Sequence, residues 1–393
     1  MHFPIPKAVL QLLRTLEEAG HEAFLVGGCV RDLLRGKSPG DYDVATRALP
    51  AQVQACFSKV IPTGIQHGTV TVLLGGMSLE VTTYRSEGEY VDGRRPSTVH
   101  FHASIEEDLS RRDFTINAMA YNPLSERWVD TWGGREDLHK GLVRCVGNPL
   151  QRFSEDGLRA IRAVRFAATL NFELDMATQK AIPQCLDLFA KVAQERTREE
   201  FLKLLASEHA QRGLALLLET GLLKTFLPEA ALADFGMATR PKHLLPRLAL
   251  LLASAPEPQA VLQRLKFSKR QWETLVHLLQ VQPLPPPHAD DAQLRRWLSK
   301  AKLPHWEEAL ALGEALERRE EGLALRMRAL LAQNPALSID KLALNGEEMG
   351  LILGIPPGPP IGEAGRFLLE KVLENPRLNS KETLSQLLQN WNK

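Results

Sequence analysis

Residues 24–43 read FLVGGCVRDLLRGKSPGDYD and combine an apolar run, a Gly27-Gly28 turn, a short helical stretch and two aspartates, Asp41 and Asp43. Glycine has no Cβ, so the turn lets backbone N–H groups approach a polyphosphate, and the helix start adds its positive dipole end. The segment DYDVA alternates like a strand, in which side chains repeat every two residues, so both carboxylates face one side. This stretch predicts a phosphoryl-transfer site.

Two carboxylates on one face suit Mg²⁺, which keeps several waters and completes its octahedron with substrate phosphate oxygens. A pair of such ions can stabilise both the attacking and the leaving oxygen of a displacement. A lone Asp-x-Asp also fits a solvated turn or a helix cap, but the glycine pair upstream favours the metal site. We therefore expect Asp41 and Asp43 to bind Mg²⁺.

The chain has 393 residues and a net charge of +1. This length predicts several domains, and the near-neutral charge confines any RNA-binding surface to a local patch. The four cysteines show no metal-binding or disulfide spacing, so we interpret them as packing residues in a reducing compartment. The N-terminal stretch lacks signal-peptide features and no apolar run reaches membrane-spanning length, so we expect a cytoplasmic protein without membrane association.

Strand-like runs gather in the first part of the chain, each bounded by Gly, Pro or Asn. They occupy residues 23–28, 41–46, 68–75, 78–85 and 143–147. After roughly residue 150 they give way to apolar residues at helical spacing. The sequence predicts an α+β fold, in which a head with a mixed sheet and helices precedes an all-α remainder. The proline-rich residues 281–291 predict a linker between two helical parts.

Three further charged groups follow the aspartates. Glu80, in the strand-like SLEVTTYR, is a candidate third carboxylate, although an exposed strand glutamate would look the same. The stretch SRRDFTINAMAYN places arginines beside an Asp and an Asn ahead of an apolar helical turn; these can bind phosphate and ribose hydroxyls, or simply cap a helix. In FSEDGLRAIRAVRF one acid and three arginines recur every three residues, which predicts one side of a helix and is ordinarily a solvated face.

The three clusters together, GGxVRD with DxD, RRDFTxNA, and EDxxR continuing into RFAxxLxF, resemble the class II tRNA nucleotidyltransferases, the CCA-adding enzymes of bacterial type. The resemblance runs from about residue 20 to 230 and is weaker over residues 342–384. It implies a DNA polymerase β-like nucleotidyltransferase head at 1–140 and a helical neck for nucleobase selection at 141–205. It further implies a tRNA-binding body at 206–282 and a tail at 292–393 that binds the tRNA elbow.

The resemblance also implies roles for individual residues. Asp41 and Asp43 would hold the metal ions, and Glu80 would be a further catalytic carboxylate. The nucleotide would be bound through triphosphate (Gly28, Arg31, Arg112), ribose (Asp113, Asn117) and base (Asp156, Arg159), with Arg162 and Arg165 nearby on nucleotide or primer.

The base-reading pair has a chemical rationale of its own. Cytosine and adenine each present an amine donor beside an unprotonated ring nitrogen, whereas uracil and guanine present a carbonyl beside a ring N–H. A carboxylate next to a guanidinium therefore complements C and A, and it leaves buried polar groups unpaired against U and G. One Asp/Arg pair can in this way replace a nucleic-acid template.

The expected reaction is attack by the tRNA 3′-hydroxyl on the α-phosphate of CTP or ATP, with pyrophosphate leaving. Residues 61–74 lack the Gly-basic-basic-Phe motif of bacterial poly(A) polymerases, which disfavours that activity. Residues 86–109 resemble the flexible loop that CC-adding relatives have lost, with Asp92 and Arg94 as loop candidates, although an ordinary surface loop explains them as well. An enzyme that adds only the terminal A keeps such a loop and stays an alternative.

Two other classes of protein are possible. A non-catalytic RNA-binding protein on a decayed fold would be expected to have lost a carboxylate, and both aspartates are intact. A nucleotidylyltransferase for small molecules or proteins has no use for an Asp/Arg base selector. The expected partners are tRNA, CTP and ATP, with no obligate protein partner. The sequence leaves open the oligomeric state and whether Glu80 binds metal or acts as a general base.

Overall fold

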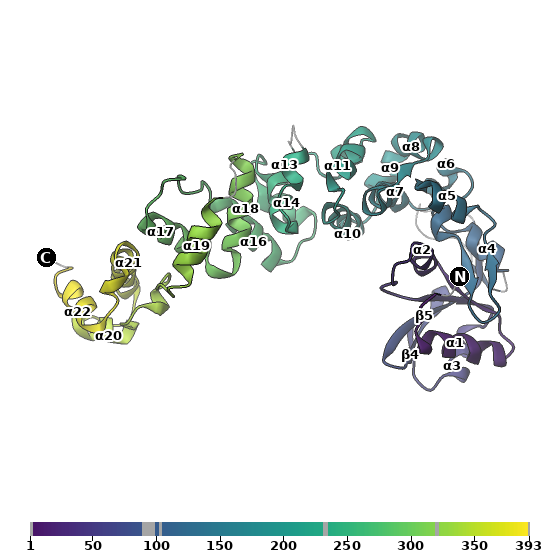
Figure 1. Cartoon of the computed structure of the whole chain (residues 1–393), viewed down its shortest axis with the longest axis horizontal. Coiled ribbons are helices and arrows are strands. Elements are labelled where there is room, and N and C mark those ends of the chain that lie inside the picture. Colours follow the sequence, from purple (N-terminus) through teal and green to yellow (C-terminus); the bar gives the residue numbers. More distant parts are fainter. Residues whose placement is uncertain (1–2, 89–98, 102–103, 231–234, 319–321, 392–393) are drawn as a thin grey trace. The chain divides into compact units, whose positions relative to one another are not determined.

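The computed structural model describes residues 3–88, 99–101, 104–230, 235–318 and 322–391. The chain forms two compact units, residues 1–228 and 229–393, and each is described by itself. The strands lie in the first unit, and the regular structure described in the second unit is helical (Figure 1). This arrangement confirms the predicted α+β fold.

The strands are β1 (Ala23–Val26), β2 (Asp43–Thr46), β3 (Val60–Gly64), β4 (Thr69–Leu74), β5 (Met77–Thr83), β6 (Arg85–Glu87), β7 (Val99–Phe101), β8 (Ala120–Asn122), β9 (Arg127–Val129), β10 (Leu142–Val143) and β11 (Glu173–Leu174). The α-helices of the first unit are α1 (Lys7–Glu18), α2 (Gly28–Leu34), α3 (Pro50–Cys56), α4 (Ile105–Ser110), α5 (Gly134–Lys140), α6 (Pro149–Glu155), α7 (Leu158–Leu170), α8 (Met176–Ala181), α9 (Leu186–Ala190), α10 (Gln194–Leu205), α11 (Ala210–Glu219) and α12 (Leu222–Phe226).

Seven strands form a mixed sheet in the order β3-β4-β5-β2-β1-β8-β9. The central strand β2 pairs antiparallel with β1 and parallel with β5. The helical turn predicted after Asn117 is wrong in part: a short 3₁₀ turn, Thr115–Asn117, leads into the hairpin β8–β9. Strands of three residues are too short to show an alternating pattern. The expectation of helices alone after residue 150 also misses β11, which pairs in parallel with β10.

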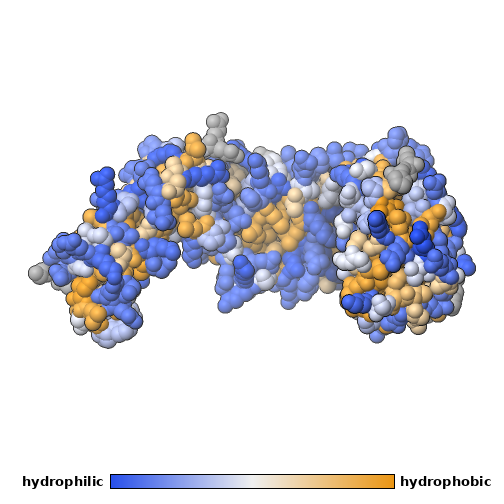
Figure 2. All heavy atoms as spheres, turned by 60° about the horizontal axis from the view of Figure 1, so that its bottom comes forward, coloured by the Kyte–Doolittle hydropathy of each residue, from blue (hydrophilic) through white to orange (hydrophobic). Residues whose placement is uncertain are grey.

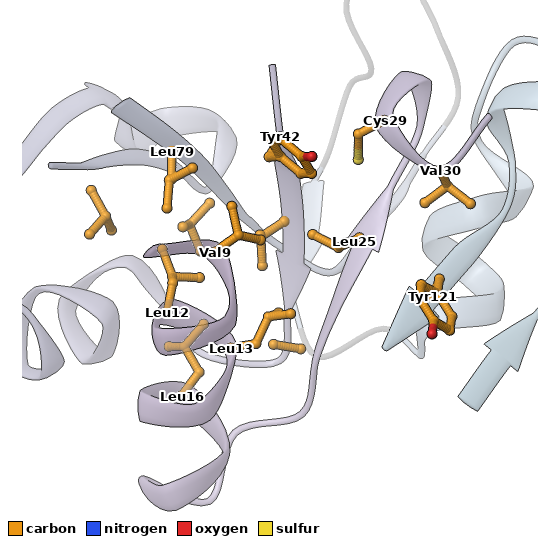
Figure 3. Close-up of a cluster of buried hydrophobic side chains, with 14 of the residues drawn as sticks. Val9, Leu12, Leu13, Leu16, Leu25, Cys29, Val30, Tyr42, Leu79 and Tyr121 are labelled. Atoms are coloured by element: carbon orange, nitrogen blue, oxygen red, sulfur yellow. The ribbon is translucent and has the colours of Figure 1, made fainter. Parts of the chain in front are cut away.

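One face of the sheet packs on α1 and α3, and this contact fixes which way the aspartates point. Leu12 and Leu16 of α1 meet Leu25 of β1 in a core that also contains Tyr42 and Val44 (Figure 3). Because side chains alternate along an extended chain, burying Tyr42 and Val44 turns the residues on either side of them toward the opposite face. The two aspartates therefore leave the core in the same direction, as the sequence predicts.

A tight turn joins β4 to β5. Gly75 and Gly76 have φ of +56° and +79°, as expected for a two-residue hairpin loop that matches the twist of its strands. A Cβ on Gly75 would lie 2.9 Å from the Cβ of Ala8, so a larger residue would also press on the start of α1. This turn sets the pairing of β4 with β5, in which Thr71 stands opposite Glu80.

The second unit contains α13 (Phe235–Thr239), α14 (Leu244–Leu252), α15 (Pro258–Arg264), α16 (Lys269–Gln280), α17 (Asp291–Ala301), α18 (Trp306–Leu316), α19 (Leu323–Leu331), α20 (Gly346–Leu353), α21 (Pro359–Glu374) and α22 (Lys381–Gln389). The proline-rich segment between α16 and α17 is packed: Leu284 and Ala289 are buried, and the Leu284 amide donates to Glu317 at 2.8 Å. The domain limits near residues 140, 205 and 282–292 stay predictions.

Figure 2 shows hydrophilic residues over most of the face in view, with hydrophobic residues gathered in separate patches. Among the described residues, no helix combines the length and the apolar character needed to cross a membrane.

Candidate active site

Asp43 and Glu80 stand opposite each other on the parallel strands β2 and β5, and Asp41 lies two residues before Asp43. Burial raises the pKa of Asp43; Arg112 opposes this rise, and the negative charge of Asp41 adds to it. Burial also raises the pKa of Glu80, and the charges of Asp43 and Asp41 raise it further. The structure thus groups the three predicted carboxylates so that the charge of Asp41 makes Asp43 harder to ionise, and the charges of both make Glu80 harder to ionise.

The three carboxylates do not form a complete metal cage. In the described part of the chain, no three His, Cys, Asp or Glu residues converge closely enough to hold a metal ion by themselves. Two carboxylates on one face nevertheless fit a hard divalent cation that takes its remaining ligands from water and phosphate oxygens. The donor set therefore suits a nucleotide-bound cation, and membership of a nucleotidyltransferase family would imply a divalent metal at this site.

The glycine turn lies directly against this group. Gly27 has φ +73° and precedes α2, and a Cβ there would come within 3.0 Å of Arg112 Nη1 and 3.7 Å of Asp43 Oδ2. Arg112 donates to Asp108, whose side chain is 1% exposed, at 3.2 Å. Gly27 is thus needed both for its backbone conformation and for the room it leaves to Arg112 beside Asp43.

A chain of hydrogen bonds connects α2 to α7. Arg31 Nη1 donates to Asn117 at 2.7 Å, and Asn117 donates to Asp113 at 3.3 Å. Asp113 accepts two bonds from Arg162, at 2.9 and 2.7 Å. Burial raises the pKa of Asp113, but Arg162 and Arg159 outweigh this effect and lower it to about 2. Four predicted nucleotide-binding residues therefore form one connected network.

Asp156 and Arg159 lie close in sequence but have different partners. Asp156 is in an extended conformation between α6 and α7, where its carboxylate accepts from the Leu158 amide at 3.0 Å and from Arg196 at 2.8 Å. Arg159, on α7, donates to Glu155 and to the carbonyl oxygen of Arg111. The prediction of one helix carrying all four charged residues is therefore wrong at Asp156, because Gly157 separates it from α7.

Sequence reasoning missed three partners of these residues: Glu155, Arg196 and Glu200. Glu200, on α10, is 5% exposed and accepts from Arg165 at 2.8 Å and from Arg162 at 3.4 Å. The run QERTREEF resembles an ordinary solvated helix face. Its one signal is the four-residue spacing between Arg196 and Glu200, which places both side chains on the same side of a helix. The loop candidates Asp92 and Arg94 lie outside the described residues.

Comparisons with known proteins agree with this geometry. Residues 23–144 match the poly A polymerase head domain, and residues 171–233 match the probable RNA and SrmB-binding site of polymerase A. A CCA-adding enzyme of Geobacillus thermodenitrificans is 37% identical over 387 residues, which cover 95% of this chain and 94% of the relative.

Solved structures give the same result. The Bacillus stearothermophilus CCA-adding enzyme in complex with CTP has a TM-score of 0.86 and 33% identity, and the match covers 98% of this chain and 97% of that one. A tRNA nucleotidyltransferase complexed with a primer tRNA and an incoming ATP analogue has a TM-score of 0.66 and 25% identity, and the match covers 82% and 98%. A sequence relationship that extends over nearly the whole of both chains shows that this chain belongs to the family of CCA-adding enzymes.

Proposed function

We propose that this chain adds CCA to the 3′ end of tRNA from CTP and ATP, without a nucleic-acid template and with release of pyrophosphate. The single observation that carries the proposal is the placement of Asp43 opposite Glu80, with Arg112 and the Gly27 turn beside them. This arrangement combines a site for a cation with donors for phosphate. The likeness to a tRNA nucleotidyltransferase complexed with a primer tRNA supports the tRNA substrate.

Asp41 and Asp43 would hold Mg²⁺, which when bound supplies charge stabilisation to the reacting phosphate and lowers the pKa of the attacking hydroxyl. The chain's own residues would orient the nucleotide. Arg112 and Arg31 would contact the triphosphate near Gly28, and Asp113 with Asn117 would hold the ribose. Fixing the α-phosphate in line with the hydroxyl reduces the entropic part of the barrier.

Asp156 and Arg159 would select the base. Arg196 and Glu155 bind these two side chains and hold the carboxylate and the guanidinium in place. Cytosine and adenine would hydrogen-bond to both groups. Uracil and guanine would set an acceptor against the carboxylate and a donor against the guanidinium. Arg162 and Arg165 would lie close to the nucleotide or the primer.

The remaining chain would bind tRNA. We assign the head to residues 1–140, the neck to 141–205, the body to 206–282 and the tail to 292–393, with the body and tail contacting the acceptor stem and elbow. Contacts of this kind recognise backbone shape more than sequence. A tRNA-processing role would place the protein in the cytoplasm.

The test uses purified protein, Mg²⁺ and labelled CTP or ATP with three tRNAs that end before CCA, after C and after CC. Synthesis of CCA on the first tRNA is expected. Incorporation of A into the third tRNA alone would identify an A-adding enzyme, and long A tails on unrelated RNA would identify a poly(A) polymerase. Binding of tRNA with no incorporation at all would favour a decayed, non-catalytic RNA-binding protein.

A further inference from the structure

Phe166, on α7, lies beneath three guanidinium groups. The Cζ atom of Arg165 is 3.5 Å from the ring centroid, and those of Arg31 and Arg162 are 5.3 and 5.4 Å away. Arg31 comes from α2, whereas the other two come from α7 itself (Figure 1 shows both helices). Among the described residues, this is the one aromatic ring that meets more than one arginine in this way.

The ring is held firmly in place. Phe166 is 4% exposed, and the ring of Phe114 meets it edge to face, with centroids 5.6 Å apart and planes at 76°. Phe114 directly follows Asp113 and pairs with Cys145 in an isolated bridge, so it is fixed as well. The buried ring presents its surface to the guanidinium groups above it.

These arginines would repel one another without compensation. Asp32 binds Arg31 at 2.9 Å, Asp113 binds Arg162, and Glu200 binds Arg162 and Arg165. A ring face also attracts cations, through its quadrupole, but carries no formal charge. Unlike a further carboxylate, it can orient guanidinium groups without repelling an anionic ligand.

We propose that Phe166 is a positioning residue for nucleotide binding: its ring aligns Arg31, Arg162 and Arg165 so that they can attract the triphosphate together. The inference rests on the proposed function, which assigns Arg31 to the triphosphate and places Arg162 and Arg165 close to the nucleotide or the primer. Because CTP and ATP share the triphosphate, the ring acts on both equally. It has no part in the choice between C and A.

The test replaces Phe166 with phenylalanines that carry one, two and three fluorine atoms, which weaken the ring's attraction for cations with little change in size. We expect the KM for CTP to rise stepwise, to about tenfold for the trifluoro ring, with the same rise for ATP and with kcat within about twofold. Phe166→Leu should give at least the largest of these rises, and Phe166→Tyr should remain near the unmodified enzyme.

The same fluorinated series at Phe114 is the matched control, because that ring packs in the same cluster and the described residues place no guanidinium over it. It should leave KM unchanged. An unmodified enzyme that incorporates neither CTP nor ATP would defeat the proposed function, whatever the ring does. If the unmodified enzyme is active, any of three results would overturn the role of Phe166. These are a KM that stays the same across the Phe166 series, equal effects at both rings, and a change in kcat alone.

Discussion

Asp43 and Glu80 are register partners on adjacent parallel strands, the first at the start of β2 and the second in the interior of β5. Two strands that come from separate parts of the chain thus bring carboxylates to the same level of one sheet face. The two groups repel each other, since the negative charge of Asp43 raises the pKa of Glu80, and the charge of Asp41 raises the pKa of both. A bound cation would relieve that repulsion.

Removing this repulsion should raise the melting temperature of the protein. A raised pKa means that folding disfavours the ionised form, so the charge on Asp43 lowers stability at any pH above its folded pKa. Without a divalent cation, Asp43→Asn should therefore unfold at a higher temperature than the wild type at pH 7. Added Mg²⁺ should raise the Tm of the wild type and leave the variant unchanged, while the variant loses nucleotide addition. A wild-type Tm that does not respond to Mg²⁺ would contradict the metal assignment.

The pKa of Asp113 is shifted in the opposite direction from that of Asp43. Its folded pKa of about 2 lies below the ordinary 3.8, so its ionised form stabilises the fold fully at pH values above 3.8. This contribution is lost as the pH falls through about 2. Asp113→Asn should cost about 2 kcal/mol in the free energy of unfolding at pH 7. Urea titrations at several pH values should show the difference shrinking only below about pH 4. A difference that already declines between pH 7 and 5 would argue against the ion pair with Arg162.

Gly27→Ala should lower the stability of the fold and should also weaken nucleotide binding. The positive φ should lower stability by about 1 kcal/mol, and the new Cβ should displace Arg112, from which it would lie 3.0 Å. We expect the KM for CTP to rise about tenfold. Gly20→Ala is the control, because Gly20 has φ +82° and nothing within 4 Å of an added Cβ. Equal kinetic effects from both variants would show that backbone strain alone is responsible.

Arg196 is expected to act on fidelity. Its guanidinium holds Asp156 at 2.8 Å, so Arg196→Gln should release the carboxylate and reduce the preference for CTP over UTP by about tenfold. Competition assays with both nucleotides measure this ratio directly. Arg212→Gln, which breaks an ion pair with the exposed Glu173, should leave the ratio unchanged. If the two variants discriminate equally well, Arg196 does not position the base selector.

Glu200 should matter mainly for the packing of α10 on α7. It is buried and binds both Arg162 and Arg165, so Glu200→Ala would leave two guanidinium groups without their carboxylate, at a cost of about 3 kcal/mol. Glu199→Gln, at the exposed neighbouring position, should change the free energy of unfolding by less than about 0.5 kcal/mol. Urea unfolding of both variants provides the comparison. A mild effect at Glu200 would show that solvent readily replaces it.

The sequence was sufficient for the fold class and for the direction of the aspartates, because both depend on local rules. Alternation along DYDVA decides which side chains leave the core, and the start of α2 follows from the glycine turn. Longer strands such as β4 and β5 carry enough alternating residues to be recognised. The hairpin β8–β9 does not, and its position depends on pairing with β1, a contact that no local pattern reports.

The candidate site was only partly predictable for a similar reason. Asp113, Asp156 and Arg159 could be selected by residue type, but the partners of Asp156 and Arg159 could not. Glu155 and Arg196 look like surface charges until the folded chain brings them to these groups. Ion pairs between helices are set by packing of α7 against α10, and spacing within one helix gives no information about its neighbour.

The two-glycine turn between β4 and β5 has a consequence far from where it lies. Its length helps to set the register of β4 and β5, and a shift of β5 by one position would turn Glu80 from the face that carries the aspartates toward the core. Every side chain that we propose to bind metal or nucleotide would still be present in such a protein. An insertion that caused such a shift would abolish activity without changing any residue of the proposed site. A search for damaging mutations that considers only those residues would miss it.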